Sequence, residues 1–172
     1  MDYTYPYSSP LGSITLASDG EMLTGLWFDG QRFFGSSLGP VHAEKSLPVF
    51  DQTMRWLDAY FKGQDPGERP MMNLRGTAFS RRVWQILLSI PYGQTMTYGG
   101  IAALLGKTMS AQAVGGAVAR NPISIIIPCH RVVGANGRLT GYAGGLQRKT
   151  ALLCLEGAAG LDPAKLKYEE KR

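Results

Sequence analysis

Residues 97–119 read TYGGIAALLGKTMSAQAVGGAVA, and this stretch predicts two short helices separated by a tight turn. The side chain of Thr97 can cap the first helix, and Gly106 can end it. After the three residues KTM, Ser110 can cap the second helix. Because a helix, a three-residue turn and a second helix make up the helix-turn-helix motif, the stretch predicts a DNA-binding module.

The second predicted helix is built almost entirely from small residues, which are Ala111, Ala113, Gly115, Gly116, Ala117 and Ala119. A glycine inside a helix costs about 1 kcal/mol relative to alanine, so the glycine pair needs an explanation. Small residues allow close packing on a neighbouring helix, or close approach of the backbone to a ligand such as a DNA groove. Packing is the commoner reason, but together with the charge distribution the pattern favours DNA.

The two halves of the chain carry opposite charge. Residues 1–75 contain 6 Lys and Arg against 9 Asp and Glu, whereas residues 76–172 contain 12 against 4. An acidic part joined to a basic part indicates two modules, the second of which faces a polyanion. The alternative is a solvated basic surface without a partner, and charge alone does not separate the two.

The first module predicts a small antiparallel sheet with one covering helix. Short alternating segments over residues 3–28 indicate a meander of strands. Residues 29–45 are rich in turn formers and predict a loop. Apolar residues at helical spacing over residues 50–61 predict the covering helix. Residues 63–76 are rich in Gly and Pro and predict a linker, so we place the domain boundary near residue 75.

Residues 76–172 predict a helical domain with a wing. Ser80 can cap a helix that precedes the helix-turn-helix. The segment IIIPCHRVV at 125–133 is typical of a buried strand, and Asn136-Gly137 indicates a hairpin turn, so a short antiparallel ribbon is expected. A last helix spans residues 146–156. The predicted fold is therefore α+β, with a small N-terminal antiparallel sheet and covering helix, then a helical winged helix-turn-helix domain.

The composition is that of a globular protein, with 44% hydrophobic and 18% charged residues. No apolar run approaches the roughly 20 residues of a membrane helix, and the N-terminal residues do not resemble a secretion signal. We therefore expect a cytoplasmic protein, or a nuclear one in a eukaryote, with Cys129 and Cys154 as free thiols. Two Cys and two His fit no zinc spacing, so neither a metal nor another cofactor is expected.

Cys129 is followed by His130 and Arg131, and three roles are open for it: nucleophile, metal ligand or buried core thiol. A reactive thiolate needs positive charge or a base nearby. Neighbouring side chains on a strand point to opposite faces, so His130 requires a bent backbone or a bridging water to act on Cys129. A histidine base also needs an orienting partner, and Glu156 is the one carboxylate between residues 76 and 156. Together these residues favour a nucleophilic site.

The run NPISIIIPCHRVV at 121–133, with TYGGIAALLG before it and GYAGG and LLCLEG after it, resembles the O6-alkylguanine-DNA alkyltransferases. These are the methylated-DNA–protein-cysteine methyltransferases, and the resemblance is close over residues 77–157. It implies that a monomeric protein transfers the alkyl group from O6 of guanine in double-stranded DNA to Cys129, irreversibly and once per molecule. The damaged nucleotide must be flipped into a pocket, because O6 is out of reach in the duplex. Repair of O4-alkylthymine is left open.

The resemblance also assigns roles to other residues. His130 would activate Cys129 through a water and would be held by Glu156. Tyr98 would protonate the departing base, and Asn121 would hold the active-site turn. The backbone lining the guanine pocket would comprise Val132, Tyr142, Ala143 and Gly144.

In such a protein the small-residue helix would enter the minor groove, with contacts from Gln112, Ala113, Gly115 and Arg120. Relatives carry an arginine at the position of Gln112, where it fills the gap left by the flipped base. Some relatives bind zinc in the N-terminal domain through Cys and His, but residues 1–75 contain no Cys, so no such site is expected.

Two alternatives belong to other functional classes. A lesion-binding protein without chemistry would resemble this chain but would lack the cysteine, which is present here. A cysteine hydrolase using Cys129 and His130 would turn over repeatedly and would have no need of a helix-turn-helix.

Overall fold

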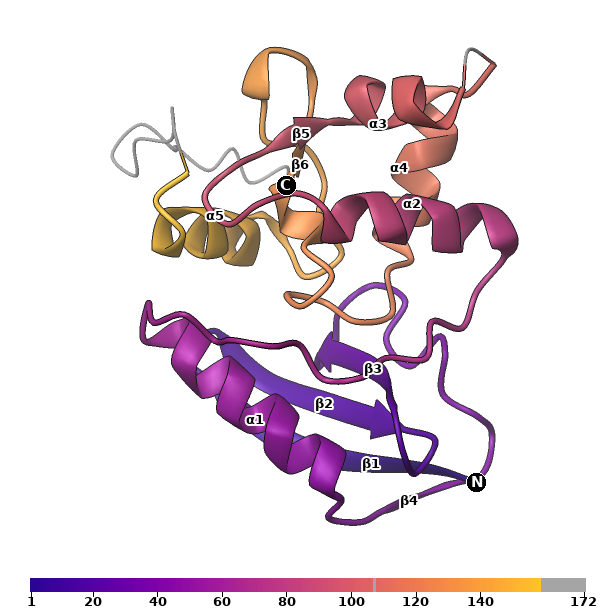
Figure 1. Ribbon diagram of the computed structural model, residues 1–172, viewed down its shortest axis with the longest axis vertical. Coiled ribbons are helices and arrows are strands. Elements are labelled where there is room, and N and C mark those ends of the chain that lie inside the picture. Colours follow the sequence, from indigo (N-terminus) through magenta and orange to yellow (C-terminus); the bar gives the residue numbers. More distant parts are fainter. Residues whose placement is uncertain (107, 159–172) are drawn as a thin grey trace.

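The computed structural model describes residues 1–106 and 108–158. Its N-terminal half contains a four-stranded sheet in the order β3-β2-β1-β4 (Figure 1). The strands are β1 (Asp2–Ser9), β2 (Gly12–Ser18), β3 (Leu23–Phe28) and β4 (His42–Glu44). The first three form the predicted antiparallel meander. The prediction was wrong for β4, which lies in the segment expected to be a loop and pairs in parallel with β1.

The helix α1 (Pro48–Phe61) covers one face of this sheet, as predicted (Figure 1). Its buried side includes Phe50 and Leu57, which pack into the apolar core. The Tyr7 hydroxyl on β1 donates a hydrogen bond to the Asp58 carboxylate at 2.7 Å and ties the helix to the sheet. Gly63 follows the helix with a φ of +70°, the left-handed conformation that favours glycine after a helix end.

The strand β3 is buried along its whole length because the C-terminal half covers its outer edge. The N–H of Leu26 donates to the carbonyl of Pro122 at 2.8 Å, and the N–H of Ser124 donates to the carbonyl of Leu26 at 2.9 Å. The linker pairs with the start of the same strand. The segment that leads to Cys129 is therefore hydrogen-bonded to the N-terminal sheet.

The C-terminal half is mainly helical, with α2 (Ala78–Leu88), α3 (Tyr98–Leu105), α4 (Ala111–Ala119) and α5 (Leu146–Leu155). The hydroxyls of Thr97 and Ser110 cap α3 and α4, which confirms both predicted caps of the helix-turn-helix. The cap predicted for α2 was wrong by one turn: Thr77 accepts from the N–H of Ser80, so Ser80 already lies inside the helix. Every helix in the described residues is too short or too polar to cross a membrane.

The isoleucine run at 125–127 is buried as predicted, but it is not a strand. The N–H of Ile127 donates to the carbonyl of Ile123 at 3.1 Å, so the chain turns there. Ile125 has a φ of +70°, which is a strained conformation for a β-branched residue. The residues Cys129–Arg131 then form a single 3-10 turn, η1. Cys129 and His130 are therefore not alternate residues of an extended strand.

The predicted antiparallel ribbon was also wrong. The strand β6 (Val132–Val133) pairs in parallel with β5 (Met96–Thr97), and Asn136 lies in a second short 3-10 turn, η2 (Ala135–Gly137). One backbone hydrogen bond, from the N–H of Gly134 to the carbonyl of Arg138 at 2.8 Å, joins the two sides of this turn, and the Lys149 ammonium group bridges them further. Lys149 Nζ donates to the carbonyl of Val132 at 2.5 Å and to that of Thr140 at 3.0 Å.

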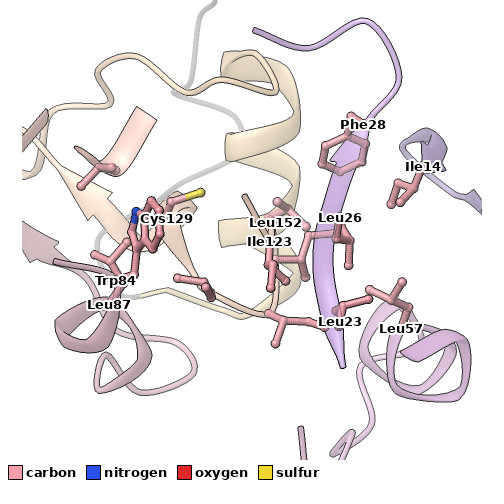
Figure 2. Packing of buried hydrophobic residues seen from close by; sticks show 14 of the residues in the cluster. Ile14, Leu23, Leu26, Phe28, Leu57, Trp84, Leu87, Ile123, Cys129 and Leu152 are labelled. Atoms are coloured by element: carbon pink, nitrogen blue, oxygen red, sulfur yellow. The ribbon is translucent and has the colours of Figure 1, made fainter. Parts of the chain in front are cut away.

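One apolar cluster runs through both halves of the protein. Figure 2 shows Leu26 on β3 facing Ile123 and Leu152 of the C-terminal half, with Leu57 of α1 on the opposite side of the same strand. The division at residue 75 stays a prediction about domains. The packing means that the two halves share one core and hold each other in register.

Candidate active site

A cavity of about 270 Å³ lies between the helix-turn-helix and the segment after η2. Its lining residues are Arg32, Tyr98, Gly115, Val118, Ala119, Cys129, Gly141, Tyr142 and Ala143. The cavity thus brings together parts of the chain that are far apart in sequence. Cys129, the candidate nucleophile, lines this cavity, whereas Cys154 does not.

Cys129 is almost completely buried and is a free thiol. Burial raises the pKa of the thiol, while the Asn121 side chain and the positive charge of Lys149 act in the opposite direction. The thiol is therefore protonated in the resting protein, and it needs a base to become a nucleophile. The Tyr142 hydroxyl, also buried beside the cavity, has no hydrogen-bond partner among the described residues.

His130, the residue after Cys129, forms a buried pair with Glu156. His130 Nε2 lies 2.6 Å from Glu156 Oε2, and both side chains are fully buried. Because an ionised carboxylate can only accept, Nε2 carries the proton and Nδ1 keeps its lone pair. Burial lowers the pKa of His130 despite the carboxylate beside it, so the ring is neutral. Nδ1 has no protein partner among the described residues and is the free basic atom of the pair.

The Glu156 carboxylate is held by three side chains. Arg131 donates from Nε to Oε1 at 2.7 Å and from Nη2 to Oε2 at 3.1 Å. The Tyr60 hydroxyl, on α1 of the N-terminal half, donates to Oε2 at 2.6 Å. Burial alone would raise the pKa of Glu156, but the hydrogen bonds from His130, Arg131 and Tyr60 outweigh it and lower the pKa to about 2. Glu156 therefore stays an anion, although it lies at the C-terminal cap of α5.

Asn121 holds the turn that carries Cys129. Its Nδ2 donates to the carbonyl of Ile127 at 2.8 Å, and its Oδ1 accepts from the N–H of Ile123 at 3.0 Å. The side chain therefore closes the loop around the strained Ile125. Asn121 also lowers the pKa of the Cys129 thiol, against the effect of burial.

The other residues predicted for the pocket are distributed around it. Tyr98, Tyr142 and Ala143 line the cavity, and the Tyr98 hydroxyl donates to the carbonyl of Gly141 at 3.5 Å. Gly144 is buried beside it, and a Cβ there would lie only 2.7 Å from the Tyr142 ring, so the position requires glycine. Val132 does not line the cavity; its carbonyl accepts from Lys149 instead.

The helix α4 presents small residues both to a neighbouring helix and to the cavity. This supports the packing explanation, and close approach to a DNA groove stays a prediction. Its buried side packs on α2, where Trp84 Nε1 donates to the carbonyl of Ala117 at 2.9 Å. Gly115 lines the cavity, and a Cβ there would meet only the Tyr98 ring at an ordinary 3.8 Å. Gln112 and Ala113 are exposed at the start of the helix, and Arg120 is exposed at its end.

Three residues of the site were missed by the sequence analysis. Lys149 is fully buried, and burial lowers its pKa to about 8. A signal was present, because Lys149 lies on the same helical face as Leu152 and Leu153. Tyr60 and Arg32 belong to the N-terminal half, and no local pattern indicates that they reach this site.

Comparisons with known proteins agree with this arrangement. Residues 78–158 match the family model described as 6-O-methylguanine DNA methyltransferase, DNA binding domain, and residues 1–66 match the one described as its ribonuclease-like domain. The chain belongs to this family. It therefore belongs with proteins that repair DNA by direct alkyl transfer, as the resemblance implied.

Relatives named methylated-DNA–protein-cysteine methyltransferase cover most of the chain. The one from Mycobacterium tuberculosis is 47% identical over 86% of this chain and 88% of its own length. The one from Methanosarcina acetivorans is 45% identical over 88% of this chain and 96% of its own. The crystal structure of Mycobacterium tuberculosis OGT in complex with DNA superposes with a TM-score of 0.81 at 44% identity, covering 90% and 92% of the two chains.

Proposed function

We propose that this protein repairs O6-alkylguanine in double-stranded DNA by transferring the alkyl group to Cys129 in a single turnover. The observation that carries the proposal is the position of Cys129, which lines a cavity walled by the second helix of the helix-turn-helix. The next residue in the chain, His130, is paired with Glu156. A flipped guanine entering this cavity would bring its O6 substituent toward the thiol.

The transfer is a displacement at the alkyl carbon. A water between the Cys129 thiol and Nδ1 of His130 would carry the thiol proton to the ring, which Glu156 holds in the correct tautomer. The C–S bond forms as the C–O6 bond breaks, and guanine leaves with the electron pair. Burial raises the pKa of Tyr98, so its phenol keeps a proton at neutral pH and can give it to the departing base. The proton lost by the thiol thus balances the proton that guanine gains.

The product is a thioether, which has no leaving group that these residues can activate. The protein is therefore consumed in the reaction. A cysteine hydrolase would instead release its product, regain the free thiol and turn over repeatedly.

The helix α4 would enter the minor groove of the DNA, with the protein acting as a monomer. Its outer side offers Ala113 and Gly115, which let the backbone approach closely, and Gln112, which can hydrogen-bond the orphaned base. Arg120 adds positive charge at the other end.

The test is the intact mass of the protein after incubation with a duplex containing one O6-methylguanine. We expect one added methyl group per molecule, mapped to Cys129, and no further product with excess DNA. Cys154→Ser should retain the transfer and is the matched control for Cys129→Ser, which should lose it because a hydroxyl is a far weaker nucleophile. Binding without an adduct would indicate a silent lesion-binding protein, and continued turnover would indicate a hydrolase; either result refutes the proposal.

A further inference from the structure

Two arginines from opposite halves of the protein meet on one aromatic ring at the edge of the cavity. The guanidinium carbons of Arg32 and Arg120 each lie 4.7 Å from the centroid of the Phe33 ring. Arg32 and Phe33 belong to the segment after β3, and Arg120 is the C-terminal cap of α4. The ring therefore positions one cation from the sheet domain next to one from the helix-turn-helix.

Neither of these cations is neutralised within the described part of the protein. The ion pairs found there involve Arg75, His130 and Arg131. Arg120 Nη1 donates to the carbonyl of Gly116 at 3.2 Å, and most other N–H groups of the two guanidiniums have no protein acceptor. Two like charges held on one ring repel each other, and the ring offsets this only in part. An anion between them would remove the repulsion.

The segment that carries Arg32 is held firmly against the cavity. The N–H of Arg32 donates to the carbonyl of Ala143 at 3.2 Å, and Arg32 itself is one of the lining residues. Phe33 has a φ of +59°, a left-handed conformation that an aromatic residue rarely adopts. Such strain persists only where the surrounding contacts over-determine it, and it is concentrated at functional sites.

We propose that Arg32 and Arg120 together bind a backbone phosphate of the nucleotide whose base enters the cavity. This assignment rests on the proposed function and extends it to a residue of the N-terminal half. When a base lies inside the cavity, its sugar and phosphates must remain at the mouth, where both guanidiniums are exposed. The planar fork of N–H groups on arginine matches phosphate oxygens, and two forks can hold one phosphate from two sides.

A phosphate explains the arrangement better than a charged alkyl group on the base. Such a group would sit inside the cavity beside Cys129, and Arg120 does not line the cavity. Arg120 is exposed at the end of α4, outside the lining of the cavity. The phosphate would thereby anchor the extruded nucleotide without contacting the reacting atoms.

The experiment compares Arg32→Gln with Arg55→Gln, which removes the same charge from the exposed side of α1. Rates of transfer to Cys129 are measured with a duplex containing O6-methylguanine and with free O6-benzylguanine, which has no phosphate. For Arg32→Gln we expect a loss of about tenfold on the duplex, equivalent to one charge-assisted contact, and a clearly smaller loss on the free base, because Arg32 also lines the cavity. Arg55→Gln should match the unchanged protein on both substrates.

Salt dependence supplies a second readout that a structural defect would not produce. The plot of log affinity against log salt for duplex DNA should lose about one unit of slope in Arg32→Gln, since one phosphate contact is removed. Arg32→Lys keeps the positive charge but lacks the planar set of guanidinium N–H groups. Its rate on the duplex should therefore lie between those of the unchanged protein and Arg32→Gln. Arg120→Gln should reproduce Arg32→Gln, and the double variant should lose less than the product of the two.

The possible outcomes distinguish a failure of the phosphate site from a failure of the proposed alkyl transfer. If the unchanged protein transfers nothing to Cys129, the proposed function fails first. If it transfers normally and Arg32→Gln behaves like Arg55→Gln, only the phosphate site is wrong. Equal losses on the duplex and on the free base would make Arg32 part of the base pocket and would also overturn the phosphate site.

Discussion

Replacing Glu156 with glutamine should destabilise the protein strongly at neutral pH and much less in acid. The carboxylate is buried and accepts from His130, Arg131 and Tyr60. Glutamine has the same shape but no charge. One carboxylate oxygen, which accepts hydrogen bonds, becomes an amide NH2 group, which donates them and would face the donors that now surround Glu156. Arg131 would then be a buried cation without an anion, a change that typically costs about 3–5 kcal/mol.

The pH dependence follows from the lowered pKa of Glu156. The shift from 4.5 to about 2 corresponds to about 3 kcal/mol of stability in the ionised form. Because the folded-state pKa is the lower one, this stability is fully present above about pH 4.5 and is lost as the pH falls toward 2. At pH 3 roughly 2 kcal/mol of it should already be gone, by the same linkage relation. The Glu156→Gln variant lacks this pH-dependent contribution to stability, because an amide does not titrate.

The measurement is the free energy of unfolding in urea at pH 7, 5 and 3 for both proteins. The difference between them should be about 3 kcal/mol or more at pH 7 and pH 5, and should shrink by roughly 2 kcal/mol at pH 3. His130 also titrates in this cluster, so the series is repeated with His130→Asn in both proteins. Tyr60→Phe is the control that removes one hydrogen bond but leaves Arg131 paired, and it should cost about 1.5 kcal/mol.

A difference that stays constant from pH 7 to pH 3 would refute this account of Glu156. It would mean that the carboxylate is not held as an anion and that the loss comes from packing alone. A Glu156→Gln protein of normal stability at pH 7 would contradict the buried pairing with Arg131.

Three further predictions address other parts of the site. Gln112→Arg should speed repair of duplex DNA by about tenfold, if a cation in the base stack stabilises the flipped state by on the order of 1.4 kcal/mol. The rate with free O6-benzylguanine should not change. Equal acceleration of both substrates would place Gln112 in the pocket. Lys149→Met should raise the pKa of Cys129, because a nearby cation is removed. The pH–rate profile with the free base should therefore shift to higher pH. An unchanged profile would mean that Lys149 only bridges backbone carbonyls. Thr77→Ala should lower the free energy of unfolding by about 1 kcal/mol, and Ser80→Ala by less than about 0.5 kcal/mol; the reverse order would restore Ser80 as the cap of α2.

The local features of the fold were predictable from the sequence, because they depend on neighbouring residues. The caps Thr97 and Ser110 accept from an N–H three residues later, so a short stretch contains all the information. The covering helix over residues 50–61 has its own apolar periodicity and was found as α1. The cap of α2 was misplaced because Thr77 and Ser80 are both good capping residues, and only the backbone distinguishes them.

The active-site turn was not predictable in this way. An apolar run of this length fits a buried strand or a buried turn equally well. The positive φ of Ile125 is imposed by hydrogen bonds from Asn121 and from β3, which are remote from the isoleucine run. The resemblance paired His130 with Glu156, and the structure contains that hydrogen bond, but Cys129 and His130 lie in a 3-10 turn and not on a strand.

Two of the three site residues that the sequence did not indicate reach the site for the same physical reason. Tyr60 and Arg32 reach the site because the edge of β3 pairs with the segment around Pro122, which fixes the N-terminal half against the C-terminal half. That pairing brings the Tyr60 phenol to Glu156 and the Arg32 N–H to the carbonyl of Ala143. The N-terminal half therefore reaches the site at two places, because Tyr60 holds the Glu156 carboxylate and Arg32 lines the cavity.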